Sequence, residues 1–229
     1  MGIPAADSIY ITHFIGNRNM NYQLPITSVI GLAIITLSAW VILVNKDLSE
    51  RRFSLFAYIC QYIGAVLLLV RIFSLQILFV VFITGLTGGA IIGTDQIEIR
   101  GPIRRPSITP SFLFRSLLGF ILWVMIFSIE PRVAVWLPVP DSILFASLWM
   151  AGVGIVEIGL DNDIFSVILG LLSIFFGFEL IYMLLEDSSL VFGFLTAINL
   201  MIALIGAFIL IKPETVSDES NDSDSEQLL

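Results

Sequence analysis

The chain has 229 residues, of which 57% are hydrophobic and 13% charged, with a mean hydropathy of +0.98 and a formal net charge of −8. Soluble domains carry about 25% charged residues, so the composition excludes an ordinary soluble domain. It also lacks the basic surface that nucleic-acid binding requires. Because the apolar residues stand in long runs, the composition predicts an integral membrane protein.

Seven apolar runs follow residues 1–25, which we expect to form an N-terminal extramembrane segment. A helix crosses the hydrocarbon core with about 20 apolar residues, and each run approaches this length. The runs are Ile26–Val44, Phe53–Val70, Ile72–Gly93, Ser111–Ile129, Ile143–Leu160, Ile164–Leu185 and Leu190–Ile211. Since they are continuous rather than alternating in polarity, we predict an all-α polytopic transmembrane helix bundle over residues 26–211.

The seven expected spans divide into two triplets and one connector. Residues 26–93 form the first triplet, residues 111–129 a linker helix, and residues 143–211 the second triplet. One linker helix returns the chain to its starting side, so this division predicts two parallel three-helix repeats. The segments SLQILFVVFITGLTGGAIIG and SLVFGFLTAINLMIALIGAFIL share a Ser-Leu start and a small-residue end.

The placement of Lys and Arg predicts the orientation, because these residues favour the cytoplasmic side. An outer N-terminus leaves three on the outer side, namely Arg18, Arg71 and Arg132. The inner side then holds Lys46, Arg51, Arg52, Arg100, Arg104, Arg105, Arg115 and Lys212. We therefore expect the N-terminus outside and the C-terminus in the cytoplasm of a bacterial or archaeal cell, in its inner membrane. The acidic tail, residues 212–229, is expected to be disordered.

Polar residues inside the spans are the candidate functional residues, because each is costly in lipid. Glu179 follows 15 residues of its span and precedes six, and an ionised acid at a helix centre costs about +3 kcal/mol. Such an acid either relays protons or fastens one helix to another through a hydrogen bond. Gln61 and Asn199, each near the middle of a span, are expected to bridge helices or hold a water.

The remaining acids lie near span ends. Glu186 and Asp187 are expected in the outer turn between the last two spans, as further proton-relay candidates. Glu157 lies one turn from Asp161 and is expected to reach the water of the inner headgroup layer. A metal centre or cofactor is not expected, because Cys60 and His13 are the only residues of their types.

Three glycines of the third span, Gly85, Gly89 and Gly93, are spaced by four residues and share one helix face. A ridge of this kind lets a neighbouring helix approach closely. We therefore assign these glycines to helix packing.

The segment GLLSIFFGFELIYMLL (170–185) carries a Gly-x-Glu-aliphatic step at Glu179, and TAINLMIALIGAFIL (196–210) is a small-residue helix. In the first half, GLAIITLSAWVILVNKDL and LFAYICQYIGAVLLLV include the step Tyr58-Ile59-Cys60-Gln61. With these features the last triplet resembles the K-type subunit of respiratory complex I. The whole chain resembles the E-type membrane subunit of hydrogenase-4 and formate hydrogenlyase complexes.

The resemblance implies a non-catalytic membrane-arm subunit of a proton- or ion-translocating redox complex, with antiporter-like membrane subunits as partners. Glu179 falls at the first of the two relay glutamates of the K-type family, whereas Asn199 falls near the second. An amide does not exchange a proton at physiological pH, so Glu186 or Asp187 substitutes, or the chain is mainly a scaffold. A stand-alone transporter of a small solute or ion and a membrane scaffold or assembly protein remain the alternatives.

Overall fold

The computed structural model describes residues 26–44, 51–93, 110–186 and 188–211. Its helices are α2 (Ile26–Val44), α3 (Arg51–Leu69), α4 (Leu75–Gly93), α5 (Pro110–Val133), α6 (Asp141–Leu160), α7 (Ile164–Leu185) and α8 (Ser189–Ile211). Each of these described helices is long and apolar enough to cross a membrane. The predicted all-α transmembrane bundle is therefore confirmed, while the expectations for residues 1–25 and 212–229 fall outside the described residues.

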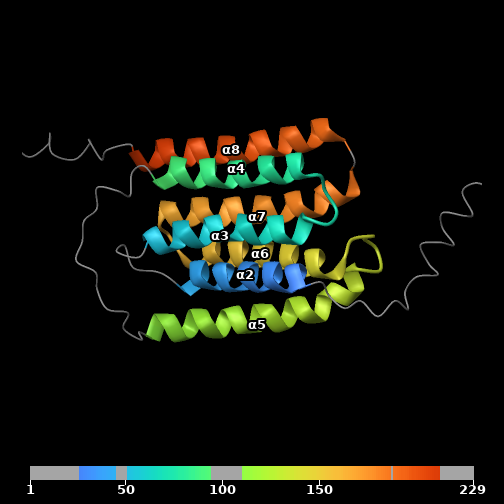
Figure 1. Ribbon diagram of the computed structural model, residues 1–229. Helices are drawn as coiled ribbons and strands as arrows, with labels where there is room; N and C mark the ends of the chain where they lie inside the picture. Colours follow the sequence, from blue (N-terminus) through green and yellow to red (C-terminus); the bar gives the residue numbers. More distant parts are fainter. Residues whose placement is uncertain (1–25, 45–50, 94–109, 187, 212–229) are drawn as a thin grey trace, which may run out of the picture.

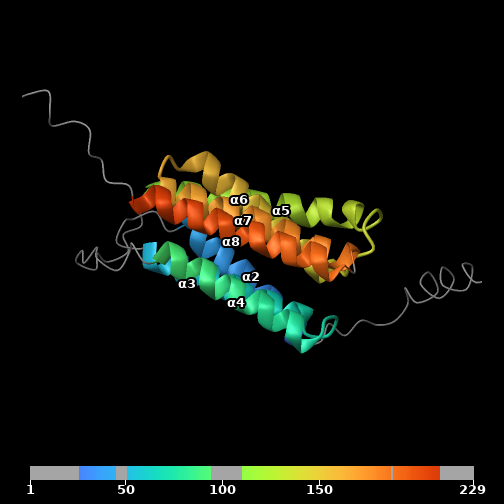
Figure 2. The same ribbon diagram turned by 90° about the horizontal axis from the view of Figure 1, so that it is seen from above.

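The helices form two rows of three (Figures 1 and 2). One row holds α2, α3 and α4, and the other holds α6, α7 and α8. Across the rows α2 contacts α6, α3 contacts α7, and α4 contacts α8, while α5 lies at one edge against α2 and α6. Successive helices alternate in direction, so each pair across the rows runs parallel (Figure 1). The internal repeat of the two triplets stays a prediction.

Two helix boundaries differ most from the predicted spans. The third span was expected from Ile72, but α4 begins at Leu75, because the chain first turns back on α3. In this turn the Leu69 carbonyl accepts from the amides of Ile72 (2.9 Å) and Phe73 (3.0 Å). The fourth span was expected to end at Ile129, but α5 continues through Pro131 to Val133.

Glycines set the spacing inside each row. Between α2 and α3, a Cβ built on Gly31 would lie 2.7 Å from the Gly64 carbonyl oxygen. Between α6 and α7, a Cβ built on Gly170 would lie 2.8 Å from the Gly154 carbonyl oxygen. The backbones of both pairs are thus too close for any side chain at these positions, which is the packing that small residues permit between membrane helices.

The outward faces of the bundle are apolar. Large hydrophobic side chains stay exposed on the outer helices, including Leu37 of α2, Phe120 of α5 and Phe208 of α8. Soluble monomers rarely expose large contiguous apolar patches. The lipid bilayer is the solvent that accommodates the outward faces of this bundle.

We predict that Gly154→Ala destabilises the bundle by about 1–3 kcal/mol, the usual cost of overpacking. The added Cβ would meet the Gly170 carbonyl oxygen and lie 2.7 Å from Cγ1 of Ile174, so α6 and α7 must separate. Gly193→Ala is the control, because a Cβ there meets nothing within 4 Å. Unfolding in mixed micelles measures both variants, and equal midpoints for them would contradict this account of the α6–α7 packing.

Candidate functional site

Glu179 lies inside the bundle, on the face of α7 that meets α8. It precedes the last residue of α7, Leu185, by six residues, or about 9 Å along the axis at 1.5 Å per residue. Its side chain is only 3% exposed. The carboxyl group is therefore surrounded by protein and faces neither lipid nor bulk water.

Both carboxyl oxygens of Glu179 accept hydrogen bonds from α8. Oγ1 of Thr196 donates to Oε1 (3.1 Å), and Nδ2 of Asn199 donates to Oε2 (3.3 Å). Thr196 and Asn199 are three residues apart, which places them on one face of the helix. The pair meets the requirement that a polar group buried in a membrane protein finds its partners inside the protein.

The amide of Asn199 also links the acid to α3. Its Nδ2 donates to the Tyr62 hydroxyl oxygen (2.7 Å), and the hydroxyl of Tyr62 lies 3.0 Å from that of Tyr58. Five side chains from three helices thus form one polar cluster, and each is at most 9% exposed. We call this cluster the Glu179 network: Tyr58, Tyr62, Glu179, Thr196 and Asn199.

Space for the two tyrosines comes from α4 and α7. A Cβ on Gly85 would overlap the Tyr62 ring, and one on Gly88 would lie 3.5 Å from the Tyr58 hydroxyl oxygen. On its other side the Tyr62 ring stacks on Phe176, with ring centroids 3.7 Å apart and planes 13° from parallel. These neighbours hold the Tyr62 hydroxyl against Asn199 and the Tyr58 hydroxyl against that of Tyr62.

The other glycines of the predicted ridge also face α3. A Cβ on Gly89 would lie 3.0 Å from Cγ1 of Ile59, and one on Gly93 would lie 3.6 Å from Cδ1 of Leu55. The ridge and the tyrosines are therefore parts of one α3–α4 interface.

Gln61 is fully buried on α3 and makes a different contact. Its Oε1 accepts from Oγ of Ser173 on α7 (3.4 Å), which bridges the two rows. Its Nε2 has no hydrogen-bond partner within the described part of the chain. Gln61 is thus a polar bridge between α3 and α7 that lies beside the Glu179 network.

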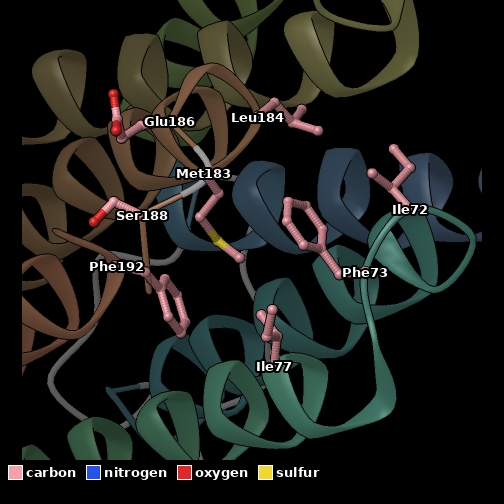
Figure 3. Close-up of a pocket in the computed structure, with 8 residues that line it drawn as sticks. All are labelled: Ile72, Phe73, Ile77, Met183, Leu184, Glu186, Ser188 and Phe192. Atoms are coloured by element: carbon pink, nitrogen blue, oxygen red, sulfur yellow. The ribbon is translucent and has the colours of Figure 1, made fainter. Parts of the chain in front are cut away.

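Glu186 is exposed, and Asp187 is outside the described residues. Glu186 follows Glu179 by seven residues, a rise of about 10 Å along the helix direction. It borders a surface pocket of about 340 Å³ between the α3–α4 turn and the α7–α8 turn. In Figure 3 the side chains of Phe73, Ile77 and Met183 converge in this pocket, while the Glu186 carboxylate points away from them. A contribution of Glu186 or Asp187 to proton transfer stays a prediction.

The donors and acceptors of the Glu179 network decide what it can do. Hydroxyl groups rotate and can either donate or accept, so Thr196 can serve both the ionised and the protonated acid. The Asn199 Nδ2 only donates, and it stands between the acid and the tyrosines. The network can therefore bind and release a proton at Glu179, but it cannot pass that proton through Asn199 to Tyr62.

The expectation that Glu157 reaches headgroup water is wrong. Its side chain is 2% exposed, and its Oε2 lies 3.8 Å from Nη1 of Arg115. The reason is that α5 packs across the end of α6 and brings Arg115 inward. Arg115 was counted only as an inner-side charge, although its position five residues inside α5 was a signal of burial.

Tyr58, Tyr62 and Thr196 were not singled out as site residues from the sequence. The tyrosines are spaced by four in an apolar span, which marks one helix face. Which helix that face meets depends on packing between segments far apart in the chain, and no local pattern reports it.

Comparisons with protein-family models, curated proteins and solved structures find no match. The resemblance to the K-type and E-type subunits therefore rests on the sequence steps quoted above. It enters the functional argument only as a proposal.

We predict that Tyr62→Phe and Asn199→Ala are coupled by about 0.6 kcal/mol, and by no more than about 1.7 kcal/mol, the range found for hydrogen bonds between membrane helices. A double-mutant cycle on unfolding in mixed micelles measures this coupling. Tyr182→Phe combined with Asn199→Ala is the control and should be additive within about 0.5 kcal/mol, because the Tyr182 ring packs on Phe178. Equal coupling in the two cycles would contradict the bond from Asn199 to Tyr62.

Proposed function

We propose that this chain is a membrane-arm subunit of a proton- or ion-translocating redox complex, in which Glu179 supplies an intramembrane site for a proton. The observation that carries the proposal is the burial of Glu179 with a hydroxyl on one oxygen and an amide on the other. The sequence resemblance to K-type and E-type subunits supplies the kind of complex.

The environment of Glu179 suits a group that alternates between two protonation states. An ionised acid is costly inside a membrane protein, and its two donors lower that cost. The Thr196 hydroxyl can rotate to accept from the neutral acid. Neither state leaves both oxygens of the acid without a partner.

The position of Asn199 favours a subunit over an independent transporter. A transporter needs a path through the whole bundle, whereas the Glu179 network is interrupted at the amide. The chain therefore contributes one protonatable group to a path that antiporter-like neighbours complete. Thr196 lies on α8 seven residues from the start of that helix. The Glu179 carboxyl group is therefore nearest the end of the bundle where α8 begins, and at this end it would exchange protons with a neighbouring subunit.

A second candidate function is a membrane scaffold, in which the same contacts only fasten α7 to α8 and α3. This function is favoured because the Glu179 network joins three helices, α3, α7 and α8. The two functions differ in whether Glu179 must titrate.

We also propose that the N-terminus is outside and the C-terminus is in the cytoplasm. Cysteines introduced at positions 2 and 229, in a Cys60→Ser chain, test this orientation with a membrane-impermeant maleimide. We expect labelling of intact cells at position 2 only, and labelling at position 229 alone would reverse the orientation.

Replacing Glu179 tests the proton-binding role. We predict that Glu179→Gln lowers ion or proton translocation by the intact complex by about tenfold or more, because a positioned proton-transfer group typically contributes about 10²-fold or more. Gln keeps the shape and an oxygen acceptor, so the yield of complex should be normal. Asp141→Asn, at an exposed position on the first residue of α6 and outside the Glu179 network, is the control and should retain translocation. Full pumping by Glu179→Gln at normal yield would leave the scaffold function.

The same purification in mild detergent tests the assignment to a complex. We expect antiporter-like and iron–sulfur subunits to be isolated together with this chain. A monodisperse monomer or homodimer would contradict membership of such a complex, independently of what Glu179 does.

A further inference from the structure

A second cluster of buried charge lies near the end of the bundle that is farther from Glu179. It forms where α5 begins and where α2 and α6 end. Arg115 and Glu157 are each 2% exposed and Asp161 is 8% exposed. We call these three residues the Arg115 cluster.

The guanidinium of Arg115 is committed to two partners. Its Nη2 donates to Oδ1 of Asp161, and its Nη1 donates to the Leu43 carbonyl oxygen at 3.0 Å. Leu43 belongs to the last turn of α2, where the carbonyls have no donor within the helix. Arg115 thus neutralises Asp161 and caps α2, which fixes it in place.

Glu157 is left with the weaker contact. Its Oε2 lies 3.8 Å from Nη1 of Arg115, which is too long for a hydrogen bond, and this oxygen has no hydrogen-bond partner among the described residues. The Ser166 side chain of α7 makes a hydrogen bond to the carboxyl group. A Cβ on Gly170 would lie 3.4 Å from the Cβ of Glu157, so α7 covers the stem of the acid and keeps water away.

Among the residues that the structure describes, the cluster contains two carboxyl groups and one cation. The charged groups that act on Glu157 from the described elements are Arg115 of α5 and Asp161 at the end of α6. With both acids ionised, these three described residues would carry one net negative charge, beside a Glu157 oxygen that has no hydrogen-bond partner in the described part of the chain. An unpaired buried charge is among the least favourable arrangements in a protein.

We propose that Glu157 is a second proton-binding site, which takes up one exchangeable proton from water on Oε2 and brings the Arg115 cluster to net zero charge. Binding forms one O–H bond and requires no other reactant. This assignment is independent of the proposed role of Glu179, because the two sites are on different helices.

Infrared difference spectroscopy of the full-length chain in lipid nanodiscs tests the proposal, since a protonated carboxyl group has its own carbonyl band that shifts in D₂O. We expect Glu157→Gln to remove one carboxyl equivalent of this band at neutral pH. Asp161→Asn should remove the same band, because Arg115 is then free to pair with an ionised Glu157. Glu186→Gln, at an exposed position, is the matched control and should remove none.

Each outcome decides the assignment. Loss of the band in Glu157→Gln, with or without loss in Asp161→Asn, supports it, whereas loss only in Asp161→Asn or in neither variant overturns it. A second readout requires no change in the cluster: ¹³C-labelled glutamate in a Glu179→Gln chain should still give a glutamic acid band, and its absence would overturn the proposal. Any band that Glu179→Gln itself removes reports on Glu179 alone. The proton-binding roles of Glu157 and Glu179 are therefore tested separately, and either one can be contradicted without the other.

Discussion

The lipid bilayer imposes one constraint on the polar side chains of this bundle: a buried polar group that finds no partner inside the protein is costly. Glu179 meets it with Thr196 and Asn199, and Asn199 extends the contact to Tyr62. These bonds require helices that approach closely. The glycines of α4 supply the space beside the tyrosines, so the packing of small residues and the satisfaction of polar groups are one structural solution.

The two buried clusters meet the constraint to different extents, since Oε2 of Glu157 has no hydrogen-bond partner among the described residues. Around Glu179 the partners are neutral hydroxyl and amide groups, so the charge of the acid is free to change with the binding of a proton. Around Glu157 the partner is the fixed charge of Arg115, which is already paired with Asp161. The first arrangement joins α7 to α8 and α3 through neutral partners, and the second joins α5 to α2 and α6 through a charged one.

The fold could be predicted from the sequence because length and continuous apolarity define a membrane span. The bounds of α2 and α7 are those expected, whereas α4 begins later because of a turn and α5 continues beyond its expected end. The burial of Glu179 followed from its distance to the span ends, but its partners did not, because periodicity gives the face of a helix and not the helix that it meets. The same gap explains the error at Glu157, where nearness to a span end suggested water and α5 supplied Arg115 instead.

The structure depends most on the contact of the Glu179 carboxyl group with the side chains of α8 within the bundle. Solid-state NMR in lipid bilayers tests it directly, through the dipolar coupling between the ¹³C of this carboxyl group and the ¹⁵N of the Asn199 side-chain amide. The account predicts the strong coupling of two groups in hydrogen-bond contact. A carboxyl carbon coupled to lipid acyl chains or to bulk water, with no coupling to Asn199, would contradict it.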